Sequence, residues 1–148
     1  MLRAFIKDNR GVSEYIGTMI SILVVMCFVL TIVSLLPIFT TKADVDYMTQ
    51  QAVRTIELTG KKGDEYTELV ADLDNAFGAG EYTLAVEGNF VTSGGIEKIQ
   101  LRNKFTVTLT VPVGIPIITP AGGEPVVITI NVAKSLTGRS EIYWKDLA

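Results

Sequence analysis

Few residues in this chain have side chains suited to catalysis or metal binding. There is no histidine and one cysteine, Cys27, which excludes His-based acid–base catalysis, a Ser-His-Asp triad and a Cys/His zinc site. Two Asp-x-Asp pairs occur, Asp44/Asp46 and Asp72/Asp74, but residues two apart point to different faces of a helix. The glycine pairs fall between expected strands, where they are typical of turns and not of phosphate loops. We therefore expect no enzyme activity, no cofactor and no metal site.

The charge balance argues against a nucleic-acid partner. The chain has 13 basic and 16 acidic residues and a net charge of −3, whereas a protein that binds the phosphate backbone carries a basic patch. One carboxylate has an unusual place, because Glu14 lies at the edge of a long apolar run. There it is either an interfacial carboxylate solvated at the headgroups or a functional carboxylate that needs a partner at membrane depth.

The apolar run is long enough to span a membrane. No charged residue occurs between Glu14 and Lys42, and residues 16–39 are almost wholly apolar. As a helix this run is about 36 Å long at ~1.5 Å per residue, more than the ~30 Å hydrocarbon core of a bilayer. A cleaved secretory signal is the less favoured alternative, because its apolar region is only about 7–15 residues long. The sequence predicts a membrane span at about residues 16–39.

The charged residues beside the span predict its orientation. Arg3, Lys7 and Arg10 precede it, whereas Lys42 is the one basic residue close behind it. By the positive-inside rule the N-terminal residues lie in the cytoplasm and the chain from Lys42 onward lies outside.

The helical pattern continues beyond the span. An apolar stripe recurs at helical spacing and comprises Val45, Met48, Ala52 and Ile56. Thr59 and Gly60 supply a stop signal, so we expect one long helix over residues 12–59. Pro37 removes one backbone hydrogen bond and is expected to kink it.

Residues 60–148 are expected to form an extracellular domain. A second helix begins near Asp64, which we expect to cap it, and its apolar face comprises Tyr66, Leu69, Leu73, Ala76 and Phe77. Alternating apolar residues then predict strands at 82–87, 98–113 and 126–132, a short last strand at 140–144, and a Pro/Gly-rich connection over 112–125. The predicted fold class is α+β: a long N-terminal hydrophobic helix, a short helix and a small antiparallel sheet of three or four strands. We expect the odd-numbered face of the 98–113 strand to pack on the apolar stripe of the long helix.

The two ends of the chain resemble a known family. The basic leader, Arg10-Gly11-Val12-Ser13 and the apolar run after it are similar to the type IV prepilin signal and to the start of archaeal pilins. Glu14-Tyr15 is similar to the Glu-Tyr pair of Flp pilins of tight-adherence systems, and residues 137–145 resemble small TadE-like proteins. The chain therefore resembles a type IV pilin-like protein, and the predicted fold is pilin-like.

The resemblance implies roles for specific residues. A prepilin peptidase would cut after Gly11 and leave Val12 as the new N-terminus, so that residues 1–11 are a leader that is either cleaved or retained. Glu14, with Tyr15 beside it, would pair with a neighbouring subunit. Glu14 stands closer to Gly11 than the family's glutamate stands to its glycine. The core of the helix bundle would comprise Ile16, Ile20, Leu23, Val24, Phe28, Leu30 and Leu35.

Three functions are consistent with these features. The first is a structural subunit of a pilus-like extracellular filament, a homopolymer whose subunits stay in the membrane before an assembly machinery extrudes them. The second is a minor pseudopilin or single-pass accessory protein of a secretion or conjugation machine. The third is a membrane-anchored enzyme or binding module, which the lack of a convergent catalytic set makes the least favoured.

Overall fold

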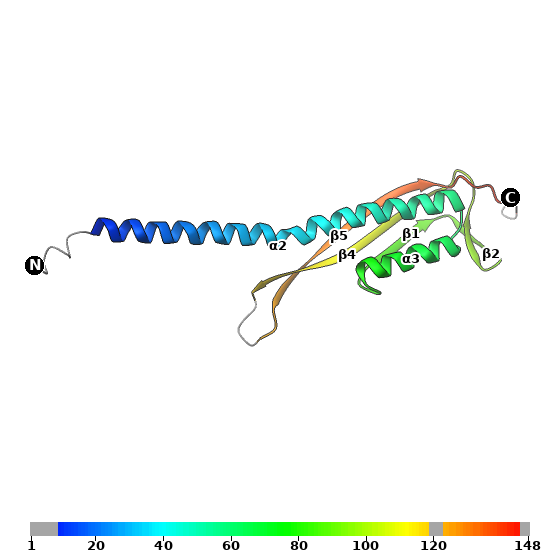
Figure 1. Ribbon diagram of the computed structural model, residues 1–148. Helices are drawn as coiled ribbons and strands as arrows, with labels where there is room; N and C mark the ends of the chain where they lie inside the picture. Colours follow the sequence, from blue (N-terminus) through cyan, green and yellow to red (C-terminus); the bar gives the residue numbers. More distant parts are fainter. Residues whose placement is uncertain (1–8, 119–122, 146–148) are drawn as a thin grey trace, which may run out of the picture. The chain divides into compact units, whose positions relative to one another are not determined.

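The computed structural model describes residues 9–118 and 123–145. Its elements are α2 (Asn9–Thr59), α3 (Asp64–Phe77), β1 (Thr83–Gly88), β2 (Phe90–Ser93), β3 (Ile96–Ile99), β4 (Lys104–Ile118) and β5 (Val126–Arg139). The chain divides between Leu36 and Pro37 into two compact units. Figure 1 shows the helices and strands, and the predicted α+β fold class is confirmed.

The helix α2 contributes to both units. It is helical through Pro37 and ends at Thr59, as the sequence predicted. Gly60 follows with a positive φ of 60°, and its N–H donates to the carbonyl of Ile56 at 2.8 Å. A Cβ atom on Gly60 would come within 2.9 Å of both Ile142 and Trp144. Glycine is therefore required there both by the backbone conformation and by the close approach of the C-terminal segment.

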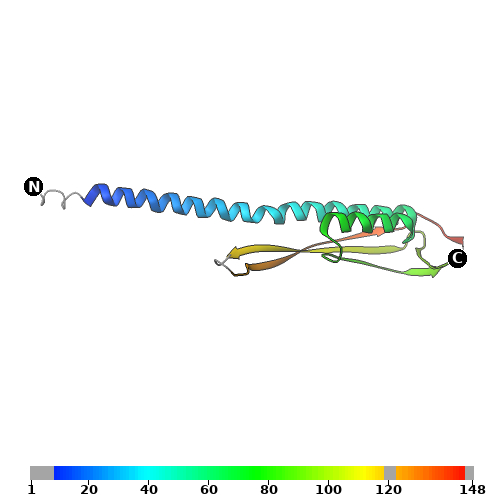
Figure 2. The same ribbon diagram turned by 60° about the horizontal axis from the view of Figure 1, so that its bottom comes forward.

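The main sheet of the second unit has three antiparallel strands in the order β1-β4-β5. The pairing of Thr83 with Thr110 ends the β1–β4 ladder, whereas β4 stays paired with β5 out to Ile118 and Val126. The two strands thus continue past β1 as a two-stranded ribbon (Figure 2). A separate hairpin, β2–β3, turns at Gly94-Gly95, which confirms the turn expected there.

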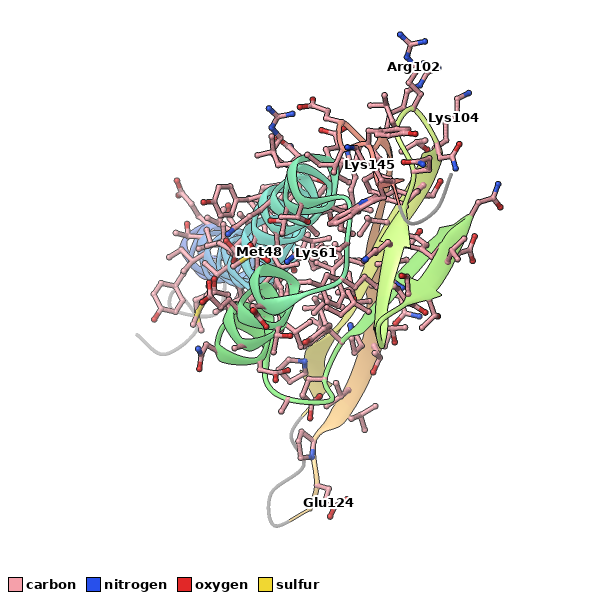
Figure 3. The ribbon with its side chains drawn as sticks, turned by 90° about the vertical axis from the view of Figure 1, so that its right-hand side faces the viewer. Met48, Lys61, Arg102, Lys104, Glu124 and Lys145 are labelled. Atoms are coloured by element: carbon pink, nitrogen blue, oxygen red, sulfur yellow. The ribbon has the colours of Figure 1, made fainter. Side chains whose placement is uncertain are left out.

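The core joins the helix stripe to the odd-numbered face of β4, as predicted. Val45, Ala52 and Ile56 are fully buried. The same cluster contains these buried residues of the strands and of α3: Leu69, Leu73, Ile99, Phe105, Val107, Leu109, Val111, Val113 and Val132. Figure 3 shows the helices gathered on one side of this sheet. Thr49 also lies in the stripe, where its hydroxyl donates to the carbonyl of Val45 at 2.6 Å and is satisfied within the helix.

The strand predicted over residues 98–113 is wrong in its first part. β3 ends at Ile99, the chain turns over Gln100–Asn103, and β4 begins at Lys104. Arg102 sits in this turn with a φ of 65°. The alternation continues across the turn by coincidence, because the exposed Leu101 falls at an odd position.

The connection predicted over residues 112–125 is also wrong in its first part, because β4 continues through Pro112 and Pro116. These prolines are an even number of residues apart, so their nitrogens face the same edge of the strand. That edge is unpaired beyond Thr110, so the prolines remove no ladder hydrogen bond with β5.

The segment predicted as a last strand, residues 140–144, is not a strand. It is held by single backbone hydrogen bonds, such as that from the N–H of Glu141 to the carbonyl of Glu57 at 3.0 Å, and by side chains. The amide of Gln100 donates to the carbonyl of Trp144 at 2.9 Å and accepts the N–H of Trp144 at 2.8 Å. The indole N–H of Trp144 donates to the carbonyl of Gly60 at 3.1 Å.

Two details of α3 also differ from expectation. Asp64 is the first helical residue and not the cap, since Gly63 occupies the N-cap without a side-chain hydrogen bond. Leu69 and Leu73 are buried as predicted, but Ala76 is exposed.

Candidate functional site: the apolar segment of helix α2

The apolar segment, defined here as residues 16–36 of α2, is the strongest candidate for a functional surface. Every residue of it is exposed in the single chain. The side chains predicted to form the core of the helix bundle are between 40% exposed (Leu35) and 68% exposed (Phe28). They are Ile16, Ile20, Leu23, Val24, Phe28, Leu30 and Leu35. The helix is long and apolar enough to cross a membrane by length and composition.

The apolar segment is hydrophobic around its whole circumference. Five consecutive large residues from Ile22 to Met26 are all exposed, and consecutive helical residues point in different directions. A helix that is apolar on all sides is stable only when something apolar surrounds it. This distribution differs from the single stripe of Val45 to Ile56, which the second unit covers by itself.

Three of the four hydroxyl side chains of the segment are already satisfied. Thr18, Thr31 and Ser34 each donate to the carbonyl four residues earlier, at 2.8–2.9 Å. A hydroxyl that bonds back to its own helix leaves little polar cost when water is removed. The segment is therefore suited to an apolar environment in spite of these residues.

The residues expected to take part in leader cleavage and in pairing between subunits lie in the first turns of α2. Gly11 and Val12 are helical, and Glu14 and Tyr15 are exposed, with Tyr15 at 69%. Residues 1–8 of the expected leader lie outside the described residues. The pairing expected for Glu14 and Tyr15 is with a neighbouring subunit, so the structure of a single chain does not test it.

The second unit has ion pairs that hold the helix to the sheet. Asp46 and Lys134 are 3.5 Å apart. Arg54 contacts Glu57 at 3.3 Å and Glu141 at 3.0 Å. Both carboxylates raise the pKa of Arg54, and the hydrogen bond with Glu141 has the larger effect. Glu57 also accepts the backbone N–H of Arg139 at 3.2 Å, at the free edge of β5. Apart from the Arg54–Glu57 pair, which lies within α2, these contacts join α2 to β5 and to the segment after it.

No catalytic or metal centre emerges among the described residues. No group of three or more metal-ligating side chains gathers in the part of the chain that the structure describes. A shallow hollow beside Glu81 and Tyr82 is lined further by Thr83, Thr110, Pro112 and Asn131. Burial and, to a lesser extent, a hydrogen bond to Asp74 raise the pKa of Tyr82 to about 12. This phenol is therefore a poor acid or base near neutral pH.

Sequence reasoning missed one apolar surface. The end of the β4–β5 ribbon exposes Val126, Val127 and Ile128. The signal was present in the sequence, because Glu124 is the one charged residue between Phe105 and Ala133. It was overlooked because the prolines indicated a loop.

Comparison with known proteins gives one family. The family model described as "Domain of unknown function (DUF4320)" matches residues 22–145. No curated protein and no solved structure matches the chain.

Proposed function

The chain belongs to the DUF4320 family, and since that family's description names no activity, we propose from the structure that this protein is a structural subunit of a type IV pilus-like extracellular filament. The observation that carries the proposal is the exposure of the whole apolar segment next to a second unit with a complete core of its own. A segment of this kind needs an apolar partner that the single chain does not contain.

Lipid is the first such partner and copies of the same helix are the second. A single-pass anchor, N-terminus inside, holds the chain in the membrane before assembly. The apolar segments then bundle by head-to-tail contacts that do not close, and such contacts generate a fibre. The bundle excludes water around about 20 residues of apolar helix, which replaces the lipid contacts that are lost.

Glu14 acts in this proposal as the register element of the bundle. A carboxylate buried among helices is costly unless a positive group pairs with it, and the pair then specifies one register. The pairing group is the N-terminal amine of a neighbouring subunit, which requires cleavage after Gly11 by a prepilin peptidase. Tyr15 lies beside this pair and is exposed for contact with the neighbour.

The test compares Glu14→Gln with Asp44→Asn, a matched loss of charge at another exposed position of α2. Cells are sheared, and the protein is quantified in the filament fraction and in the membranes. We expect E14Q to lower the filament fraction by more than about tenfold, because breaking a buried charge pair costs about 3–5 kcal/mol. D44N should assemble as the wild type does, and membrane levels should be equal for both variants.

Two results would count against parts of this proposal. Normal filaments from E14Q would remove the register role of Glu14. Absence of the wild-type protein from purified filaments, with all of it in membranes, would favour the alternative function: a minor pseudopilin or single-pass accessory protein of a secretion or conjugation machine.

A further inference from the structure

The end of the β4–β5 ribbon is apolar on both faces. Ile115 pairs with Ile128, and Pro116 pairs with Val127. Adjacent pairs point to opposite faces of a sheet, so Ile128 continues the core face while Val127 lies on the other face. Ile128 is 52% exposed and Val127 46% exposed. One packed helix would cover only one of these faces.

Two contacts fix how the ribbon runs along the helix within the second unit. Lys134 meets Asp46, and the backbone of Arg139 meets Glu57. The helix advances about 17 Å from Asp46 to Glu57 at ~1.5 Å per residue. The strand advances about 17 Å from Lys134 to Arg139 at ~3.3 Å per residue. β5 and this part of α2 therefore run side by side in the same direction.

At the Pro37 end of the unit, the ribbon extends further than the part of α2 that belongs to this unit. From Lys134 back to Val126 the strand covers about 26 Å, whereas from Asp46 back to Pro37 the helix covers about 14 Å. The ribbon end thus projects about 12 Å beyond the level of Pro37, past the part of α2 that belongs to this unit. Figure 3 shows Glu124 at this end, away from Arg102 and Lys104 at the opposite end.

We propose that the ribbon end, residues Ile115, Pro116 and Val126–Ile128, is a membrane-surface contact that inserts into the lipid interface beside the span. The expected span reaches Phe39, and Lys42 is the first charged residue after it, so the Pro37 end of the unit is the membrane end. A projection of about 12 Å is long enough to bring the ribbon end into the headgroup layer, which is about 6 Å thick per leaflet. Lipid can surround both faces of the ribbon, whereas a single protein partner would cover only one of them.

Two further features fit a lipid partner. The free edge of β4 carries Pro112 and Pro116, which lack the N–H donors that an added strand would need. Glu124 is the one charge of the region and is exposed. Its carboxylate keeps the insertion shallow, at the depth where headgroups and water still solvate it.

The experiment places a fluorophore at the ribbon end of the full chain. In a Cys27→Ala background, which removes the one native thiol, Val127→Cys is labelled with an environment-sensitive dye. The matched control is Val91→Cys, a valine of β2 that is 52% exposed. β2 and β3 lie at the other end of the unit, where Ile99 donates to the carbonyl of Gly60. Val126→Cys serves as a second ribbon position if Val127→Cys does not fold.

The labelled proteins are placed in phosphatidylcholine nanodiscs that hold one chain each, with nitroxide groups on the lipids. We expect lipid nitroxides to quench the ribbon label at least about threefold more than the Val91 label, with a blue-shifted emission at the ribbon alone. Equal quenching at both positions would overturn the proposal. Protection of the ribbon that appears only with several chains per disc would overturn it in favour of a second copy. This inference needs the span and not the filament, so a failure of the filament test leaves it intact.

Discussion

Tyr82 connects α3 to the first strand by a hydrogen bond whose strength depends on pH. Its hydroxyl donates to Asp74 at 2.9 Å, and its ring lies 6.3 Å from that of Phe77. Partial burial and, to a lesser extent, this hydrogen bond raise the pKa of Tyr82 to about 12. A folded-state pKa above the ordinary value of about 10 means that the neutral phenol stabilises the fold. That contribution is complete below pH ~10 and is lost as the pH rises through about 12.

The prediction is a loss of stability at high pH that depends on this one phenol. Tyr82→Phe should remove the highest-pH step from the tyrosinate absorbance titration and should flatten the fall in thermal stability between pH ~10 and ~12. Tyr143→Phe, which changes an exposed tyrosine, is the matched control and should retain both features. A high-pH step that persists in Y82F would show that another group produces it.

The sequence identified Glu14 as a candidate residue but did not identify the group that would pair with it. Its position at the edge of an apolar run identified it as a candidate, because a charge there is costly. The partner proposed for it could not be identified in the same way, since a pair between chains would leave no pattern in the spacing of one chain. The fate of Gly11 has the same limit, because cleavage depends on recognition by a peptidase.

The packing of α2 on β4 contributes to the core of the second unit. Ile56 is fully buried in the core, whereas Leu58, two residues later on the same helix, is 49% exposed. We expect Ile56→Ala to lower the free energy of unfolding of this unit by about 2–5 kcal/mol, through lost apolar burial and a residual cavity. Leu58→Ala should change it by less than about 0.5 kcal/mol.

The measurement is denaturant unfolding of the full chain in detergent, followed by the fluorescence of Trp144, the one tryptophan. Trp144 reports on this unit because its indole N–H is bonded to the carbonyl of Gly60. Equal losses of stability in the two variants would contradict the packing described here.

Periodicity predicted the helices and most of the sheet, because burial imposes it directly. The stripe from Val45 to Ile56 and the alternation from Phe105 to Val113 match the two faces that meet in the core. Chain reversals without glycine or proline were not predictable. The turn over Gln100–Asn103 uses Arg102 at positive φ, a conformation that its residue type does not indicate.

The prolines of β4 misled the prediction in the opposite direction. Pro112 and Pro116 are typical of a connection, yet both are tolerated because they face an edge that β1 leaves unpaired. Which edge is free depends on the length of β1 and on the strand order, and neither can be deduced from the residues of β4. The apolar ribbon end was overlooked for this reason, although its lack of charge was visible.

At the scale of the whole molecule, the two units differ in what they need. The second unit buries its own apolar stripe and satisfies its C-terminal segment through Gln100, Ser140 and Trp144. The first unit has no such cover, since all of residues 14–36 are exposed. We therefore expect folding stability to depend on the second unit and the proposed association on the first, so variants of the two should have separable effects.

We propose that, in the assembled filament, the apolar segment lies in contact with copies of itself. The most direct measurement is a helical reconstruction, by electron cryomicroscopy, of filaments sheared from cells that produce this protein. We expect α-helical density for residues 16–36 packed around the filament axis, with the β sheets outside and Glu14 facing the first residue of a neighbouring chain. Filaments built without this chain, or with this segment absent from their core, would contradict it.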